Sequence, residues 1–137
     1  MPGYSGTPLP KKLGIKPGLR AQLFNAPLDV SSELREPLAE CTVAKPGTAL
    51  DFAILFSKSS VGLAREFLPL AKLLAPAGML WVSWPKKSSG VATDVDEHVV
   101  RRIGLEAGLV DVKVCAVTDV WSGLKFVRRV KDRKPST

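Results

Sequence analysis

The 137-residue sequence contains only two cysteines and one histidine, and it has no apolar run long enough to cross a bilayer. A spanning helix needs about 18 or more consecutive apolar residues, and the amino-terminal segment lacks the apolar centre of a signal peptide. We therefore expect a cytoplasmic protein that does not enter the membrane. Cys41 and Cys115 lie in separate apolar segments without CxxC spacing or clustered histidines, which predicts buried, reduced thiols rather than a disulfide or a metal site.

Motifs that specify a reaction are also missing. The sequence has no Walker-type glycine loop, no HExxH and no GxSxG. His98 lies between Glu97 and Val99 in an expected helix, which favours a surface position over the role of a base beside a nucleophile. The sequence therefore indicates a fold and a binding site more strongly than a reaction.

Acidic residues are absent from the first 20 positions, which carry four basic side chains. Residues 101–137 are also net positive, whereas residues 21–100 are slightly negative, and the whole chain has a net charge of +7. Basic ends often contact nucleic acid or acidic partners, although a solvated tail has the same composition. The chain has no zinc finger, helix-turn-helix or aromatic-rich RNA-binding signature, so nucleic acid is the less favoured partner.

Length and composition predict one compact domain, because 45% of the residues are hydrophobic and 24% are charged. We divide the chain into an arm rich in glycine and proline at 1–19, an α/β domain at 20–130 and a basic tail at 131–137. Leu13 and Ile15 are expected to hold the arm against the core.

Hydrophobic periodicity predicts alternating strands and helices. The expected strands are 20–25, 41–44, 50–56, 79–84, 110–117 and 123–128, and the expected helices are 31–38, 61–74 and 93–107. The helices should begin at Ser31 or Ser32, at Ser59 or Ser60, and at Thr93. Pro69 should kink or split the second helix. The almost continuously apolar run 50–56 is typical of a central strand that is covered on both faces.

The alternation predicts a three-layer, Rossmann-like α/β fold with a mainly parallel sheet. The strands near 20–25, 50–56, 79–84 and 110–117 should run parallel, and the last strand, near 123–129, should run antiparallel. This order, with Asp51 leading a strand and Ala75-Pro-Ala-Gly78 preceding the next, resembles a trimmed S-adenosylmethionine-dependent methyltransferase fold over about residues 20–130.

The resemblance implies a cofactor site that this sequence does not repeat. In those enzymes a glycine-rich loop follows the first strand, and an acidic residue at the end of the second strand holds the ribose. The matching stretches here are Asn25-Ala-Pro27, in which proline supplies no backbone donor, and Lys45-Pro46-Gly47, which has no carboxylate. We therefore expect that S-adenosylmethionine does not bind tightly in the usual pose.

Several shorter motifs resemble a small bacterial family called domain of unknown function 3052. The matching segments span nearly the whole chain, and they are Gly3-Tyr-Ser-Gly-Thr-Pro-Leu9, Lys12-Leu-Gly-Ile15, Asn25-Ala-Pro27, Trp84-Pro-Lys-Lys87, Ser89-Gly-Val-Ala-Thr-Asp94, Asp111-Val-Lys-Val-Cys-Ala116 and Val120-Trp-Ser-Gly-Leu-Lys-Phe126. The family brings no catalytic residue that can be transferred to this chain.

The strongest candidate site is the loop after the strand 79–84. Ligands of open α/β sheets collect at the carboxyl ends of strands, and lysines, serines and glycine there can hold an anion. Trp84 and Trp121 are expected to flank a planar group. The expected ligand-binding residues are Asn25, Ser57, Lys58, Trp84, Lys86, Lys87, Ser88, Ser89, Gly90, Trp121 and Ser122. Asp94 is either an acid-base partner of these lysines or a helix cap.

Two functions fit these observations. The first is a non-catalytic binding or regulatory module that recognises a small anionic ligand or an acidic protein surface at the carboxyl edge of the sheet. The alternative is a divergent small methyltransferase that assembles its cofactor site differently. Retention of S-adenosylmethionine by the purified protein would separate the two.

Overall fold

The computed structural model describes residues 7–43, 45 and 47–133, so the expectations for residues 1–6, Ala44, Pro46 and 134–137 lie outside the described residues. The elements in chain order are α1 (Leu9–Leu13), β1 (Arg20–Phe24), α2 (Leu28–Glu33), α3 (Arg35–Ala39), β2 (Thr42–Val43), β3 (Leu50–Phe56), α4 (Ser60–Leu73), β4 (Leu74–Pro85), η1 (Lys87–Ser89), α5 (Glu97–Glu106), β5 (Leu109–Ala116), β6 (Trp121–Arg128) and η2 (Val130–Asp132). No helix in this described part has the length and apolar character that a bilayer crossing requires.

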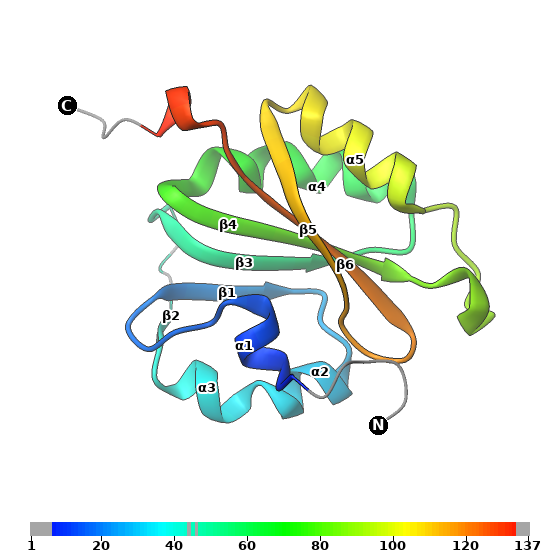
Figure 1. Cartoon of the computed structure of the whole chain (residues 1–137), viewed down its shortest axis with the longest axis horizontal. Helices are drawn as coiled ribbons and strands as arrows, with labels where there is room; N and C mark the ends of the chain where they lie inside the picture. The colour runs from blue at the N-terminus through cyan, green and yellow to red at the C-terminus, as the bar shows by residue number, and fades with distance from the viewer. Residues whose placement is uncertain (1–6, 44, 46, 134–137) are drawn as a thin grey trace.

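Six strands form one sheet in the order β2-β1-β3-β4-β6-β5 (Figure 1). β1 pairs in parallel with both β2 and β3, and β3 pairs in parallel with β4. β6 lies antiparallel between β4 and β5. The predicted fold, a mainly parallel sheet with an antiparallel last strand, is confirmed.

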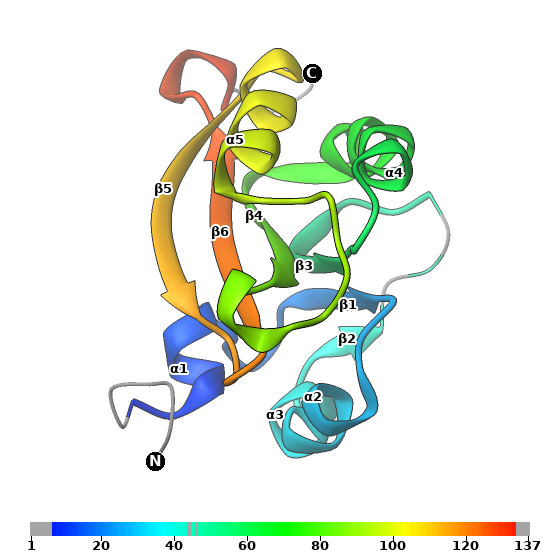
Figure 2. The same ribbon diagram turned by 90° about the vertical axis from the view of Figure 1, so that its right-hand side faces the viewer.

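Helices cover both faces of the sheet, with α1, α2 and α3 on one side and α4 and α5 on the other (Figure 2). Successive residues of a strand point to opposite faces, and β3 shows the consequence. Phe52, Ile54 and Phe56 are buried in the cluster that includes α1 and α2, whereas Ala53 and Leu55 are buried in the cluster that includes α4 and α5. The continuous apolar run of β3 is therefore explained by burial on both faces.

Both ends of α4 are bonded to residues that come much later in the chain. At its start, Asp94 accepts hydrogen bonds from the Ser60 amide at 2.7 Å and from the Ser60 hydroxyl at 2.6 Å. At its end, the Arg128 guanidinium donates to the carbonyl oxygens of Ala71 at 3.1 Å and Leu74 at 2.6 Å. A cation at a helix carboxyl end also complements the helix dipole.

Two predicted helix starts are wrong. The segment expected to form one helix from Ser31 or Ser32 forms two short helices, and α2 begins after Pro27, whose fixed φ suits a helix start. The third helix begins after Asp96 rather than at Thr93, because the Asp96 carboxylate accepts the Val99 amide at 2.9 Å. The cap expected at Ser59 is confirmed.

The junction between α4 and β4 also differs from expectation. α4 continues through Pro69 without being split, and β4 begins at Leu74 rather than at Met79. The pairing of β4 with β3 is irregular near this start. A Cβ on Gly78 would lie 2.6 Å from the Leu50 carbonyl oxygen, so only glycine lets the two backbones approach this closely.

The described part of the arm packs on the sheet through α1. Leu9, Leu13 and Ile15 are buried, and the indole nitrogen of Trp81 donates to the Leu13 carbonyl oxygen at 2.9 Å. The division of the chain at residues 19 and 130 stays a prediction.

The two cysteines lie near opposite edges of the sheet. Cys41 precedes β2 and Cys115 belongs to β5, and both thiols are free and partly exposed rather than buried as expected. Burial raises the pKa of the Cys115 thiol. A disulfide between them is incompatible with this topology.

Candidate functional site

A hollow of about 480 Å³ opens at the carboxyl end of β4, and we call it the β4 hollow. Its size falls within the range of small-molecule sites. It is formed by the end of β4, the following loop, the first turn of α5 and the start of β6. The residues that line it are Trp84, Pro85, Lys86, Lys87, Thr93, Asp94, Val95, Asp96, Glu97, His98 and Ser122.

Hydrogen bonds fasten one wall of the β4 hollow to the start of α4. The Thr93 hydroxyl donates to the Lys58 carbonyl oxygen at 2.7 Å, and Asp94 accepts both bonds from Ser60. The Ser60 hydroxyl is the main reason that the pKa of Asp94 lies below its usual value, and the Ser60 amide adds to the effect. Asp94 is therefore a cap, as one of our two expectations held, but it caps α4 and not α5.

The β4 hollow is not lined by basic and hydroxyl side chains alone, as the expected anion site would be. Asp94, Asp96 and Glu97 line it together with Lys86 and Lys87. Carboxylates at the amino end of α5 are favoured because they cap the first turn and complement the helix dipole. The hollow therefore presents both signs of charge.

Glu97 is the carboxylate of the hollow that is paired with an arginine and does not serve as a helix cap. It accepts a hydrogen bond from Arg101 at 2.7 Å, yet its side chain remains 45% exposed. Arg101 is shared with Asp111, to which it donates at 2.9 Å. The Asp96 carboxylate, by contrast, already caps α5.

The loop after β4 is folded on itself. The Ser89 hydroxyl donates to the Lys86 carbonyl oxygen at 2.6 Å and accepts the Val91 amide at 3.2 Å, so it is engaged within the loop. Gly90 adopts φ 78° beside open space. Within the described residues, no ion pair engages the ammonium groups of Lys86 and Lys87. Ser88 is exposed but does not line the hollow.

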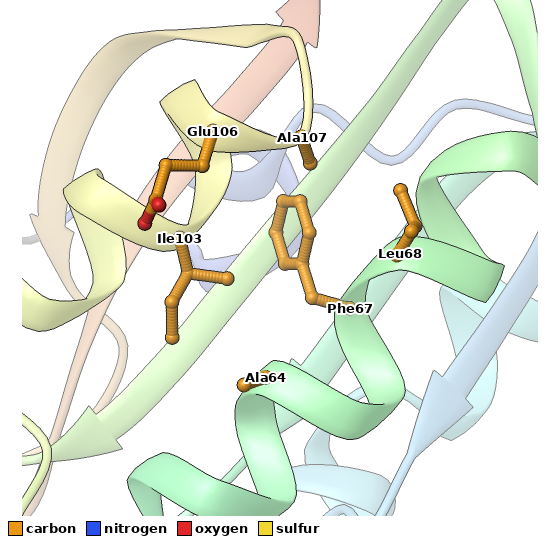
Figure 3. Close-up of a pocket in the computed structure, with 6 residues that line it drawn as sticks. All are labelled: Ala64, Phe67, Leu68, Ile103, Glu106 and Ala107. Atoms are coloured by element: carbon orange, nitrogen blue, oxygen red, sulfur yellow. The ribbon is translucent and has the colours of Figure 1, made fainter.

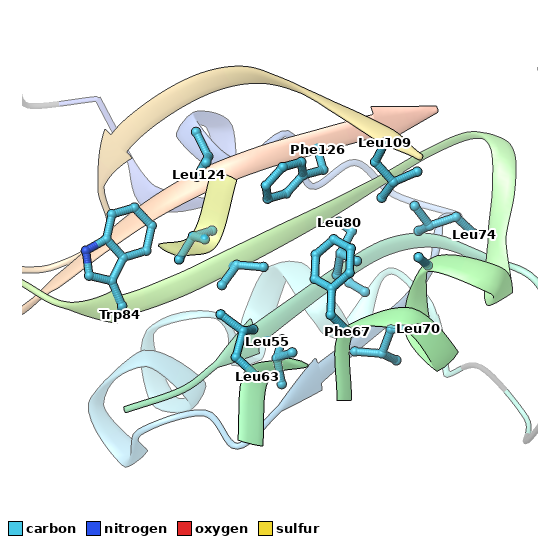
Figure 4. Packing of buried hydrophobic residues seen from close by; sticks show 14 of the residues in the cluster. Leu55, Leu63, Phe67, Leu70, Leu74, Leu80, Trp84, Leu109, Leu124 and Phe126 are labelled. Atoms are coloured by element: carbon cyan, nitrogen blue, oxygen red, sulfur yellow. The ribbon is translucent and has the colours of Figure 1, made fainter. Parts of the chain in front are cut away.

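The two tryptophans lie on opposite faces of the sheet, so the expectation that they flank one planar group is wrong. Trp84 is 5% exposed and packs in the cluster that contains α4 and α5 (Figure 4). Trp121 packs against the other cluster and makes an edge contact with Phe56, with ring centroids 5.3 Å apart. Both Trp121 and Ser122 belong to β6 rather than to a loop, and only Ser122 lines the β4 hollow.

Asn25, Ser57 and Lys58 lie at the ends of β1 and β3 and do not line the β4 hollow. The Asn25 amide donates to the Phe56 carbonyl oxygen at 3.4 Å and to Glu66 at 3.2 Å. The Ser57 hydroxyl donates to a neighbouring backbone carbonyl oxygen, so it serves the turn into α4. These three predicted residues are therefore not brought together with Lys86 and Lys87.

A hollow of about 350 Å³ lies beside β1 and the loop after β2, and its lining residues include Phe24, Lys45 and Gly47. That S-adenosylmethionine does not bind tightly in the usual pose at this end of the sheet stays a prediction. Asn25 has φ 59°, so it makes the sharp turn that glycine makes in the related fold. Its side chain, however, is bonded to Glu66, and the next residue but one is Pro27, which has no amide hydrogen. Lys45 follows the end of β2, where a carboxylate would be needed.

The residues of the β4 hollow that our reading of the sequence did not include are Pro85, Thr93, Val95, Asp96, Glu97 and His98. We expected His98 at the surface, and its side chain is exposed, so that prediction is confirmed. With the helix start at Asp96, His98 falls in the first turn of α5 and lines the hollow. The signal was present in Asp96 itself, which is a second suitable cap.

A smaller hollow of about 230 Å³ lies between α4 and α5 (Figure 3). Its walls include Phe67, Leu68 and Ile103. Glu106 is its one titratable side chain, and it pairs with Arg102 at 3.6 Å. Because this hollow has few polar side chains, it has fewer groups that could bind or react with a ligand than the β4 hollow has.

Known proteins are similar to this chain in structure. A magnesium protoporphyrin IX methyltransferase from Synechocystis PCC 6803 with bound SAH gives a TM-score of 0.60 at 14% identity, over 88% of this chain and 78% of that chain. The O-methyltransferase NcsB1 from neocarzinostatin biosynthesis, in complex with S-adenosylmethionine, gives 0.54 at 11% identity, over 80% and 41%. The mitomycin 7-O-methyltransferase MmcR gives 0.53 at 13% identity, over 80% and 41%.

No protein-family model and no curated protein matches the chain, so the resemblance to the bacterial family is not supported. The structural neighbours also overturn our main functional expectation, a non-catalytic binding module, and favour its alternative. At these identities the comparison establishes the architecture: the chain has the fold of S-adenosylmethionine-dependent methyltransferases.

Proposed function

We propose that the chain is a divergent methyltransferase that binds its S-adenosylmethionine-type cofactor in the β4 hollow. The observation that carries this proposal is the hollow of about 480 Å³ at the carboxyl edge of a methyltransferase-like sheet, lined by both carboxylates and lysines. Ligands of open α/β sheets collect at this edge. When bound, the cofactor supplies the methyl group.

The charges of the hollow suit a ligand with groups of both signs. S-adenosylmethionine carries a sulfonium, an ammonium, a carboxylate and a ribose diol. Glu97 can accept hydrogen bonds from the diol or the ammonium, and Lys86 or Lys87 can bind the carboxylate. The imidazole of His98 lines the same hollow and carries both a hydrogen-bond donor and an acceptor, so it can orient the methyl acceptor.

Calorimetric titration with S-adenosylmethionine tests this proposal. Glu97→Gln should weaken binding about tenfold or more, because a hydrogen bond to a charged group contributes about 1.5–3 kcal/mol and 1.4 kcal/mol corresponds to tenfold. The matched control is Glu106→Gln, which removes a carboxylate from the same helix and from a similar arginine pair but lies outside the hollow. The control should bind like the parent.

Two further variants locate the ligand. The Lys86→Ala, Lys87→Ala double variant should fold normally and lose affinity, because neither ammonium belongs to the core. Lys45→Ala should bind like the parent, since the end of β2 is not used. A parent that binds neither S-adenosylmethionine nor its demethylated product at millimolar concentration would refute the proposal. If Lys45→Ala loses affinity and the Lys86→Ala, Lys87→Ala variant does not, the cofactor binds at the ends of β1 and β2, in the usual pose.

A further inference from the structure

Two lysines face each other directly across β5 and β6. Lys113 and Lys125 are register partners in this antiparallel pair. The Cβ atoms of such partners lie about 4.5–5.5 Å apart on the same face, and like charges in this position are destabilising. A sheet that kept this pair for packing alone would be more stable with one of the charges removed.

The pair lies on the face of the sheet that α1 covers, away from the β4 hollow. Leu124 and Phe126, on either side of Lys125, are buried in the cluster with α4 and α5. Because side chains alternate along a strand, Lys125 points to the opposite face. Figure 2 shows α1 on this side, beside the end of β5.

Lys16, which follows α1, adds a third positive charge. The pKa of the Lys125 ammonium is lowered first by burial and then by the charges of Lys113 and Lys16. All five ion pairs of the described residues use arginine, so none of these three lysines is paired with a carboxylate there. The cluster therefore concentrates positive charge.

The packing of α1 explains why a lysine occupies position 113, but not why lysines occupy positions 16 and 125. The Lys113 ammonium donates to the Lys12 carbonyl oxygen at 3.2 Å, and the Lys12 ammonium donates to the Ala116 carbonyl oxygen at 2.9 Å. These reciprocal bonds fasten α1 to β5. They give no reason for a lysine at position 125 or 16.

We propose that Lys113 and Lys125 form a binding site for a phosphate group, with Lys16 adding positive charge from the turn after α1. An anion beside the ammonium groups of Lys113 and Lys125 would turn their repulsion into attraction, and lysine binds phosphate as a compact point charge. The site is independent of the proposed methyltransferase function, because it uses the other face of the sheet. The phosphate belongs either to a small phosphorylated molecule or to a nucleic-acid backbone.

Thermal unfolding at low salt, with pyrophosphate and with a short single-stranded RNA as separate probes, tests this site. Lys125→Met keeps the length of the side chain and removes the charge, and Lys16→Ala alters an exposed position outside the core. The control is Lys72→Met, an exposed lysine on α4 whose loss changes the net charge equally. Without a probe, Lys125→Met should unfold at the same temperature as the parent or higher.

Stabilisation of the parent and of Lys72→Met, lost in Lys125→Met and Lys16→Ala, would support the site. A response to pyrophosphate then assigns a small phosphorylated molecule, and a response to RNA alone assigns a nucleic-acid backbone. If a probe raises the unfolding temperature of Lys125→Met and Lys72→Met equally, the stabilisation depends on net charge alone, and the proposal is overturned. The absence of any response from the parent would overturn it as well.

Discussion

At the scale of the residue, Asp94 connects the loop of the β4 hollow to the start of α4. Its two bonds from Ser60 hold the pKa of its carboxyl below the usual value of 3.8. A carboxyl whose pKa is lower in the folded than in the unfolded chain stabilises the fold above the unfolded pKa. That stabilisation is lost as the pH falls through the folded pKa.

Asp94→Asn should therefore lower the melting temperature by several degrees at pH 7, and the difference from the parent should shrink below about pH 4. Thermal unfolding of both proteins across pH 2–8 measures this. Asp119→Asn, which removes an exposed carboxylate elsewhere, should show no such difference. A gap between Asp94→Asn and the parent that stays constant down to pH 2 would show that the charge is not what stabilises the turn.

At the scale of the element, α5 packs on β6 through a glycine. A Cβ on Gly104 would lie 2.0 Å from the ring of Phe126. That ring is fully buried and makes an edge contact with Phe67, with centroids 5.4 Å apart, so it has little room to move. Gly104 is thus required by packing and not by helix formation.

Gly104→Ala should destabilise the protein by about 1–3 kcal/mol through overpacking. Intrinsic helix propensity alone predicts the opposite, a gain of about 1 kcal/mol. Gly62→Ala in α4 is the matched control, since its Cβ would meet only ordinary contacts at 3.5 Å and beyond, and it should be neutral or stabilising. Urea unfolding of both variants measures the two changes in the free energy of unfolding. Equal changes would mean that the Phe126 ring moves to make room for the new methyl group.

The same two scales show what the sequence could and could not predict. β3 and the part of β4 from Met79 onward were predictable because buried parallel strands are continuously apolar. The start of α5 was not, because Thr93 and Asp96 are both suitable caps and only the bond from Thr93 to Lys58 removes the first from the helix. The separation of Trp84 and Trp121 depends on the register of β4 and β6, which no local pattern contains.

At the scale of the whole molecule, the sheet is unequally supported. β2 has two exposed residues and two register partners on β1, whereas β3 and β4 are buried between helices on both faces. Regions with few buried contacts open with less free energy than the core.

Native-state hydrogen exchange should therefore show fast exchange for the amides of β2 and the slowest exchange in β3 and β4. The Thr42 amide, which donates to the Leu19 carbonyl oxygen, is a convenient reporter for the β2 edge. Protection of Thr42 equal to that of β4 would mean that the sheet opens as one unit.

The bonds at the two ends of α4 have a consequence for synthesis on the ribosome. The groups that complete this helix lie 34 positions after its start, at Asp94, and 54 to 57 positions after its end, at Arg128. A nascent chain released only as far as β4 has neither group available. The long-range bonds at both ends of the helix nearest the middle of the chain can therefore form only late in synthesis.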